Sequence, residues 1–385
     1  MNRKTLSLGF IGGGWNSAVG ATHFIASRMD GLFSVDAGVF SRHAEVNQQT
    51  SSRWDVDAAR TYDSATQMLE REAGKLDAVV ILAPTPSHTD LVLEALRNGF
   101  AVICEKALAA TRDDALRIAE AVEASSGFLA VTYNYTGYPM VRELRRIMRA
   151  GRLGRITQVH VEMPQEGFAR LGPKGEPASP QAWRLIDGPI PTISLDLGVH
   201  VHHLVRFLTG EETREVVALH GVHGNFPGVI DNVMCMARYS GGMDASFWFS
   251  KSAIGHRNGL RLRVYGSKGS AEWFQMAPEE LRIHSVHGEL SLLDRASIDA
   301  SLASEARYTR FKVGHPAGFI EAFANLYDDI GLSLLARQKG QPADSEFVFG
   351  ARDAVAGLAA LEAMAISART RAWTDVASIT PQTKP

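Results

Sequence analysis

Apolar and polar positions follow two different patterns along the chain, and the pattern changes near residue 133. Before it, short continuous apolar runs alternate with stretches that have helical periodicity. Continuous apolar runs are typical of strands buried on both faces, and the helical stretches are typical of the helices that cover them. This order predicts an α/β domain with a doubly wound parallel sheet over residues 1–133. The predicted strands are residues 6–11, 32–40, 76–83, 101–105 and 128–132.

Polar residues mark the helix ends in this first part. Residues 89–98 form a helical pattern that Gly99 closes. Residues 111–124 form another, in which Thr111 is placed to cap the first turn and Asp113 and Asp114 complement the helix dipole.

After residue 133 a period of two predominates. Residues 156–161 and 260–265 alternate apolar and polar, and a glycine turn leads into a further strand over 270–274. Such strands have one packed face and one charged face, which predicts a large, open, mostly antiparallel sheet in a second α+β domain over 134–385. No segment is evident that would cover its apolar face, so we expect a homodimer or homotetramer assembled through this sheet.

The remaining segments of the second part are helices and one loop. A helix over 141–148 is expected to end at Gly151, and residues 167–179, rich in Gly, Pro and charge, are expected to form a surface loop. Two helical patterns, 319–335 and 345–371, close the chain.

Composition narrows the class of protein. The chain has 385 residues, 40 basic against 42 acidic side chains, and a net charge of -2, so nucleic acid is not an expected partner. Cys104 and Cys235 lie far apart in apolar runs, which favours free thiols in a reducing compartment. No leader and no membrane-spanning run is evident, so a soluble cytoplasmic protein is expected.

A glycine cluster follows the first predicted strand. Gly12, Gly13 and Gly14 stand between that strand and a helix, where a close backbone approach and free N–H groups bind a pyrophosphate. Ser17 replaces the third glycine of the usual fingerprint, and Gly20 follows late, so the loop from Trp15 is expected to be longer. Residues 1–133 are therefore expected to form a dinucleotide-binding domain of the Rossmann type. The alternative is an ordinary tight turn.

The second predicted strand is followed by Ser41 and Arg42, where an acidic residue is usual. A hydroxyl and a guanidinium suit a 2′-phosphate, whereas a carboxylate would suit a free ribose. The cofactor is therefore expected to be NAD(P), with a slight preference for NADP. The alternative is a solvated loop arginine.

Two further groups of residues carry candidate chemistry. Glu105 and Lys106 end a parallel strand, and Asp196 and His200 share a face of a helix that runs to Leu208 beside an apolar stripe. The alternatives are a capping aspartate, a core histidine and a surface lysine. A metal site with His203 is spatially feasible, but no metal is expected because further ligands are not evident.

Together these motifs resemble the Gfo/Idh/MocA oxidoreductase family over nearly the whole chain. The resemblance rests on Gly12–Gly14 with His23, Pro84-Thr85-Pro86-Ser87-His88, Glu105-Lys106, Asn134-Tyr135, Trp183-Arg184 and Asp196-x-Gly-x-His200. It implies that Lys106, Asp196 and His200 are catalytic and surround the nicotinamide and the reacting carbinol. Departures are Ala107 in place of proline, the segment 188–192 in place of a glycine-rich stretch, and His203 in place of an aspartate.

The expected contacts are therefore of two kinds. Cofactor contacts are expected from Gly12, Gly13, Gly14, Trp15, Ser41, Arg42, Pro84, Thr85, His88, Glu105, Lys106, Asn134, Trp183 and Arg184. Substrate contacts are expected from Lys106, Tyr135, Gln165, Arg184, Asp187, Asp196, His200 and Asn258.

The expected reaction is hydride transfer between the cofactor and a carbinol carbon of a sugar, a sugar derivative or a cyclitol. His200 is expected to act as base with Asp196 orienting it, and Lys106 to donate a hydrogen bond, with the reverse assignment open. Two alternatives remain: an NAD-dependent glycoside hydrolase that oxidises its substrate transiently, and a non-catalytic regulator on the same fold.

Overall fold

The computed structural model describes residues 4–342 and 345–377, and the chain divides into two compact units. The first unit joins Met1–Gly137 to Phe319–Val355, and the second joins Tyr138–Gly318 to Ala356–Pro385. The return of Phe319–Val355 to the first unit is a long-range pairing that the rhythm of strands and helices does not signal. The expected domain division, 1–133 and 134–385, stays a prediction.

The sheet of the first unit has five parallel strands in the order β2-β1-β3-β4-β5, as predicted for a Rossmann-type domain. The central strand β3 is buried along its whole length because helices cover both faces of the sheet. The strands are β1 (Leu6–Gly12), β2 (Phe33–Val39), β3 (Ala78–Leu82), β4 (Ala101–Cys104) and β5 (Leu129–Val131).

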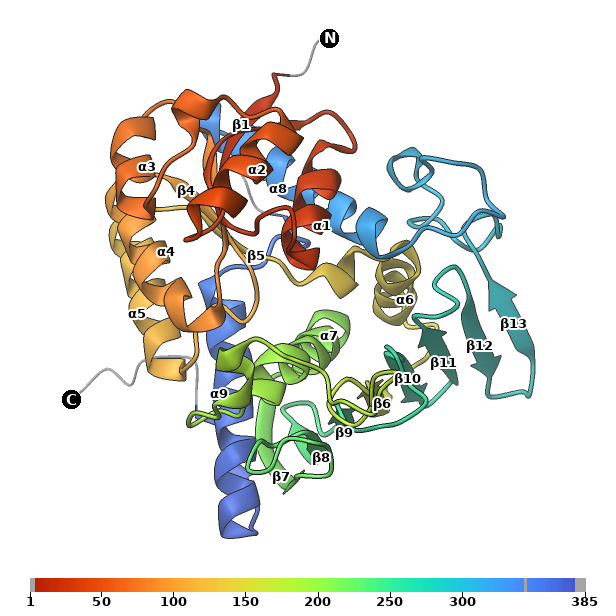
Figure 1. Cartoon of the computed structure of the whole chain (residues 1–385). Coiled ribbons are helices and arrows are strands. Elements are labelled where there is room, and N and C mark those ends of the chain that lie inside the picture. Colours follow the sequence, from red (N-terminus) through yellow and green to blue (C-terminus); the bar gives the residue numbers. More distant parts are fainter. Residues whose placement is uncertain (1–3, 343–344, 378–385) are drawn as a thin grey trace, which may run out of the picture. The chain divides into compact units, whose positions relative to one another are not determined.

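Side-chain caps fix several helices of this unit. Thr111 Oγ1 accepts a hydrogen bond from Asp114 N at 3.1 Å, which confirms the predicted cap. The late helix α8 returns to pack beside α1 (Figure 1). The helices are α1 (Ala18–Arg28), α2 (Ala44–Trp54), α3 (Ala65–Glu72), α4 (His88–Arg97), α5 (Arg112–Ala124) and α8 (Phe319–Gln338), with short 3₁₀ turns Ala58–Arg60, Thr85–Ser87 and Asn134–Gly137.

The second unit contains a nine-stranded sheet in the order β13-β12-β11-β10-β6-β9-β8-β7-β14. Only the β6–β9 pair is parallel among the described strands of this sheet, so the predicted mostly antiparallel sheet is confirmed. The strands are β6 (Ile156–Pro164), β7 (Thr213–Gly221), β8 (Asn232–Tyr239), β9 (Asp244–Ser250), β10 (Arg261–Gly266), β11 (Gly269–Phe274), β12 (Leu281–Ser285), β13 (Leu290–Leu293) and β14 (Thr374–Asp375).

Helices cover the apolar face of this sheet, so the expectation that no segment would cover it is wrong. Helix α7 packs against β6 and α6 packs against β11, and Ser367 of α9 accepts a hydrogen bond from Ala218 N of β7 at 3.0 Å. Within the described part of the chain, no helix is long and apolar enough to cross a membrane. The helical segments are α6 (Pro139–Arg149), α7 (Val199–Thr209) and α9 (Ala351–Thr370, of which Ala356 onward belongs to this unit), the π-helical turn Ser194–Gly198, and 3₁₀ turns Ala182–Leu185 and Ala306–Tyr308.

Candidate functional site

The carboxyl ends of the five parallel strands meet at one edge of the first unit's sheet, where open α/β sheets bind ligands. The cofactor residues predicted in this unit follow these strand ends. Gly13, Gly14 and Trp15 follow β1, Ser41 and Arg42 follow β2, Pro84, Thr85 and His88 follow β3, Glu105 and Lys106 follow β4, and Asn134 follows β5.

The turn after β1 is built on glycines that tolerate no side chain. Gly13 has φ +71°, and a Cβ on it would lie 2.5 Å from Leu82 Cδ1. A Cβ on Gly20 would lie 1.7 Å from Gly13 O, so the late glycine allows the close approach of α1 to the turn. Ser17 instead caps α1 through Gly20 N at 3.3 Å. The turn thus combines backbone access with a helix N-terminus, which fits a pyrophosphate.

Among the buried side-chain donor atoms of this unit that have no protein acceptor in the described structure, Trp15 Nε1 follows β1 and Asn134 Nδ2 follows β5. Leaving such a donor unsatisfied costs about 1–3 kcal/mol, which the acceptor atoms of a bound ligand can recover. Together with the glycine turn, these donors fit a nicotinamide dinucleotide.

The backbone at the start of the loop after β2 is held by a buried asparagine, and the loop carries an exposed arginine. Asn47 Oδ1 accepts from Phe40 N at 2.7 Å, and Asn47 Nδ2 donates to Tyr62 O at 2.7 Å. Ser41 Oγ accepts from His43 N at 3.1 Å, while the Arg42 side chain is exposed. No side chain caps the adjacent N-terminus of α2.

Glu105 belongs to a buried cluster that the sequence only partly predicts. Its Oε1 lies 3.0 Å from His23 Nε2 and accepts from Thr132 Oγ1 at 2.5 Å. Burial alone raises the pKa of Glu105, but the hydrogen bond and charge of His23 outweigh it and lower the pKa below its ordinary value. His23 Nδ1 is in turn 2.7 Å from the Tyr327 hydroxyl, whose pKa is raised by burial. Neither Thr132 nor Tyr327 carries a sequence signal.

His88 joins two loops at the same edge. Its Nε2 lies 2.7 Å from Ala83 O and its Nδ1 2.8 Å from Ala107 O, directly after the cis peptide bond between Lys106 and Ala107. Burial lowers the pKa of His88, although both carbonyl contacts favour the proton. His88 therefore connects the segment after β3 to the segment after Lys106. The Lys106 residue is partly exposed. The predicted cofactor contact of His88 is a separate matter and stays a prediction.

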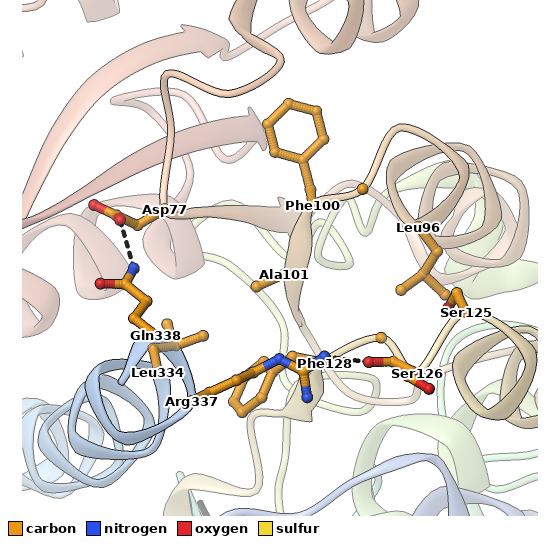
Figure 2. A pocket seen from close by; sticks show the side chains of 12 residues that line it. Asp77, Leu96, Phe100, Ala101, Ser125, Ser126, Phe128, Leu334, Arg337 and Gln338 are labelled. Carbon is orange, nitrogen blue, oxygen red and sulfur yellow. Dashed lines mark hydrogen bonds between the residues drawn. The ribbon is translucent and has the colours of Figure 1, made fainter. Parts of the chain in front are cut away.

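A cavity of about 360 Å³ lies at the opposite edge of this sheet (Figure 2). Asp77, Phe100 and Phe128, which line it, stand immediately before β3, β4 and β5. Gln338 Nε2 donates to Asp77 Oδ1 at 2.7 Å, and Arg337 binds Ser126 O. This cavity is at the amino ends of the strands and is distinct from the edge that carries the glycine turn.

In the second unit, Asp196 lies inside a π-helical turn that leads directly into α7. It is therefore not a helix-capping residue, and wider π turns are frequent at functional sites. The predicted apolar stripe of the helix is buried, but His200 and His203 are buried as well, so the helix is enclosed on more sides than its pattern predicted. No group of three or more metal-binding side chains occurs among residues 4–342 and 345–377.

Two cations hold the Asp196 carboxylate. Arg184 Nη1 lies 2.7 Å and Lys251 Nζ 2.6 Å from the same oxygen, Oδ2. Arg184 was predicted and lies over the ring of Trp183 at 4.6 Å. Lys251 was missed, because a single lysine after a strand has no distinguishing pattern. The structure thus brings together Arg184 and Asp196, which were each predicted to contact the substrate.

The other predicted substrate residues fall into separate groups. Asp187 accepts from Thr192 N and Ile230 N, both at 2.8 Å, and so fixes the segment 188–192. Gln165 Nε2 donates to Asn258 Oδ1 at 3.1 Å, which brings these two residues together. Asn258 Nδ2 in turn donates to Gln275 Oε1 at 2.7 Å. Gln275 was not predicted from the sequence.

Tyr135 lies in the first unit, where it is buried against the ring of Phe319 at a centroid distance of 6.1 Å. Trp183, in the second unit, donates from Nε1 to Gln181 Oε1 at 2.8 Å. The roles of both residues stay predictions.

Comparison with known proteins places these features in a family. Residues 6–133 match the family model described as "Oxidoreductase family, NAD-binding Rossmann fold", and residues 141–272 match the GFO/IDH/MocA C-terminal domain. The chain is 27% identical over 347 residues to the uncharacterized oxidoreductase YfiI of Bacillus subtilis (strain 168), covering 87% of each.

Two solved structures are similar over nearly their full length. An oxidoreductase from Sinorhizobium meliloti is 32% identical, with a TM-score of 0.84 and coverage of 96% of this chain and 99% of that one. An inositol dehydrogenase homolog from Azotobacter vinelandii, complexed with NADH and myo-inositol, is 25% identical, with a TM-score of 0.85 and coverage of 97% and 98%.

Proposed function

This chain belongs to the Gfo/Idh/MocA family of NAD-binding oxidoreductases, and on that premise we propose that it transfers a hydride between a nicotinamide cofactor and a carbinol carbon of a sugar, a sugar derivative or a cyclitol. The observation that carries this proposal is the Asp196 carboxylate, held by Arg184 and Lys251 one helical turn before His200. The myo-inositol in the Azotobacter vinelandii homolog supports the polyol class.

The proposed roles follow the chemistry of alcohol oxidation. The bound nicotinamide supplies the hydride acceptor. His200 takes the hydroxyl proton and Asp196 orients its imidazole, while Lys106 donates a hydrogen bond to the substrate oxygen. Tyr135, Gln165, Arg184, Asp187 and Asn258 are proposed to bind the remaining hydroxyl groups.

The proposed cofactor preference is NADP, by a small margin. It is supported by the exposed Arg42 guanidinium, the Ser41 hydroxyl and the absence of a carboxylate directly after β2. A guanidinium binds a phosphate bidentately, and nothing in this loop would repel a 2′-phosphate as an acidic residue does.

The test is a screen of sugars, inositols and sugar acids with NAD⁺ and NADP⁺ in parallel. The readout is the absorbance of the reduced nicotinamide. Stoichiometric reduction of the cofactor with a polyol is the expected result. Release of a sugar from a glycoside without net reduction would support the hydrolase alternative. Binding of ligand without any turnover would support a regulator.

A further inference from the structure

Lys251 is a buried lysine whose backbone is fixed independently of its side chain. It follows β9, its N–H donates to Asp231 O at 2.7 Å, and its carbonyl accepts from Phe168 N at 2.7 Å. The side chain is 7% exposed and extends over the ring of Phe168, with Nζ 4.8 Å from the ring centroid. A change of side chain can therefore leave the loop in place.

The placement of this ammonium is costly for stability alone. Burying a cation loses its hydration, and replacing a buried ion pair by apolar side chains of similar volume is often neutral or stabilising. The ring of Phe168 would pack equally well against a neutral methionine. A purely structural role therefore does not account for a lysine at this position.

The electrostatic arrangement gives the lysine a different role. Lys251, from the segment after β9, and Arg184, from the turn Ala182–Leu185, both bind Asp196 Oδ2. The buried Asp231 of the same unit is held by neutral donors instead: it accepts from His223 N at 3.0 Å and from Ser252 Oγ at 3.0 Å. Two cations on one oxygen fix both the ionisation and the rotation of the Asp196 carboxylate.

We propose that Lys251 is a positioning residue for the oxidation: together with Arg184 it holds the Asp196 carboxylate ionised and in one orientation. Its positive charge also partly compensates the negative charge that Asp196 places near His200. This inference rests on the proposed function, in which Asp196 orients the base His200. Other charged or titratable groups around this helix include His202, His203 and Arg206 on α7, Arg145 on α6, and Glu212, which pairs with Arg206. Burial lowers the pKa of both His202 and His203 below the ordinary value of a histidine.

The experiment compares Lys251→Met, Lys251→Arg and a matched control, Arg295→Met. Arg295 is a second buried cation of the same unit, with Nε 2.5 Å from Glu279 Oε2, and it has no part in the proposed chemistry. The readouts are kcat and KM for myo-inositol or the best polyol of the screen, the dissociation constant for NAD⁺, and the thermal midpoint of each variant.

Lys251→Met is expected to lower kcat by about 10-fold or more while the KM and the NAD⁺ affinity change little, because orientation and not binding is lost. Lys251→Arg is expected to restore most of the rate. Removing the cation also leaves the negative charge of Asp196 less compensated, which favours the protonated form of His200. The low-pH limb of the kcat profile should therefore move to higher pH. Arg295→Met should lose stability without either effect. If Lys251→Met matches Arg295→Met in all kinetic readouts, the positioning role is wrong.

A readout without turnover separates this inference from the proposed function. In protein labelled with ¹³C-histidine, the His200 resonance is identified by its loss in His200→Gln. Its titration should shift to higher pH in Lys251→Met, and an unchanged titration would overturn the inference. Wild-type protein that oxidises no polyol would refute the proposed function and leave this result standing.

Discussion

His23 Nε2 and Glu105 Oε1 lie 3.0 Å apart although 82 positions separate them in the sequence. Because an ionised carboxylate only accepts hydrogen bonds, Nε2 must donate to Glu105, and Nδ1 forms the hydrogen bond with the Tyr327 hydroxyl. This chain of three buried side chains joins α1, the end of β4 and α8 directly beside Lys106. The backbone that carries Lys106 is thus anchored by polar contacts and not by apolar packing alone.

Two substitutions in this hydrogen-bonded chain of side chains should lower the free energy of unfolding by different amounts. Tyr327→Phe removes one hydrogen bond and should cost about 0.5–1.5 kcal/mol, whereas His23→Ala removes one of the donors that hold the buried Glu105 carboxylate and should cost about 2–4 kcal/mol. Urea unfolding of both variants measures the difference. Tyr265→Phe, at an exposed tyrosine, is the control and should be near neutral. Equal stability of Tyr327→Phe and wild type would contradict the assigned hydrogen bond.

Lys106→Ala and His200→Ala should each lower kcat by about 10²-fold or more, as is typical for a lost acid–base or electrostatic group. Lys106→Ala should leave nucleotide affinity nearly intact because the pyrophosphate is assigned to the glycine turn. Asp196→Asn should move the lower-pH limb to lower pH, since an amide stabilises imidazolium less than a carboxylate does. The measurement is steady-state kinetics across pH, with cofactor affinity determined separately. Near-wild-type kcat in both alanine variants would favour a binding or regulatory function.

Arg42→Ala should weaken NADP binding more than NAD binding. The lost contact is a charge-assisted hydrogen bond to the 2′-phosphate, worth about 1.5–3 kcal/mol, and NAD has no such group. Fluorescence titration of wild type and variant with both nucleotides measures this. A wild-type preference for NAD, or equal effects on the two nucleotides, would remove the basis for the NADP proposal.

Glu72 should make stability depend on pH. Burial alone raises the pKa of this carboxyl, but hydrogen bonds from Arg60 and Tyr62, both at 2.6 Å, outweigh it and lower the pKa. The resulting stability is fully present above the unfolded pKa of about 4.3 and is lost as the pH falls through the lower folded value. Glu72→Gln should therefore cost about 1.5–3 kcal/mol at neutral pH. In urea unfolding, a difference from wild type that does not shrink on acidification would argue against this assignment.

The outer face of the nine-stranded sheet should mediate self-association. Leu219 of β7 and Met234 and Met236 of β8 are each more than half exposed there, while the opposite face is covered by helices. Exposed apolar side chains on a wide sheet indicate an interaction surface. Light scattering should give a mass of at least twice 41.8 kDa, and Met236→Glu should reduce it while Met276→Glu, in an exposed turn, should not. A monomer at micromolar concentration would refute this expectation.

Local patterns were enough to predict the class of fold and the edge at which the cofactor residues gather. Continuous apolar runs predicted β1 to β5, and carboxyl ends of parallel strands meet at one edge whatever the rest of the chain does. Thr111 could be identified as a cap because capping depends on neighbouring residues alone. Gly20 was only noted as late; its close approach to Gly13 needed the packing of α1 against the turn.

The partners of the chemical groups were decided only by the tertiary structure. Asp196 and His200 could be identified from their spacing, but the ion pair between Lys251 and Asp196 joins segments that have no common periodicity. Tyr327 reaches His23 because α8 returns to the first unit over a distance in sequence of 304 residues. Hydrophobic periodicity reports which face of an element is buried, and it carries no information about which distant side chain meets that face. Spacing therefore determined the candidate groups, and long-range packing determined their charge environment.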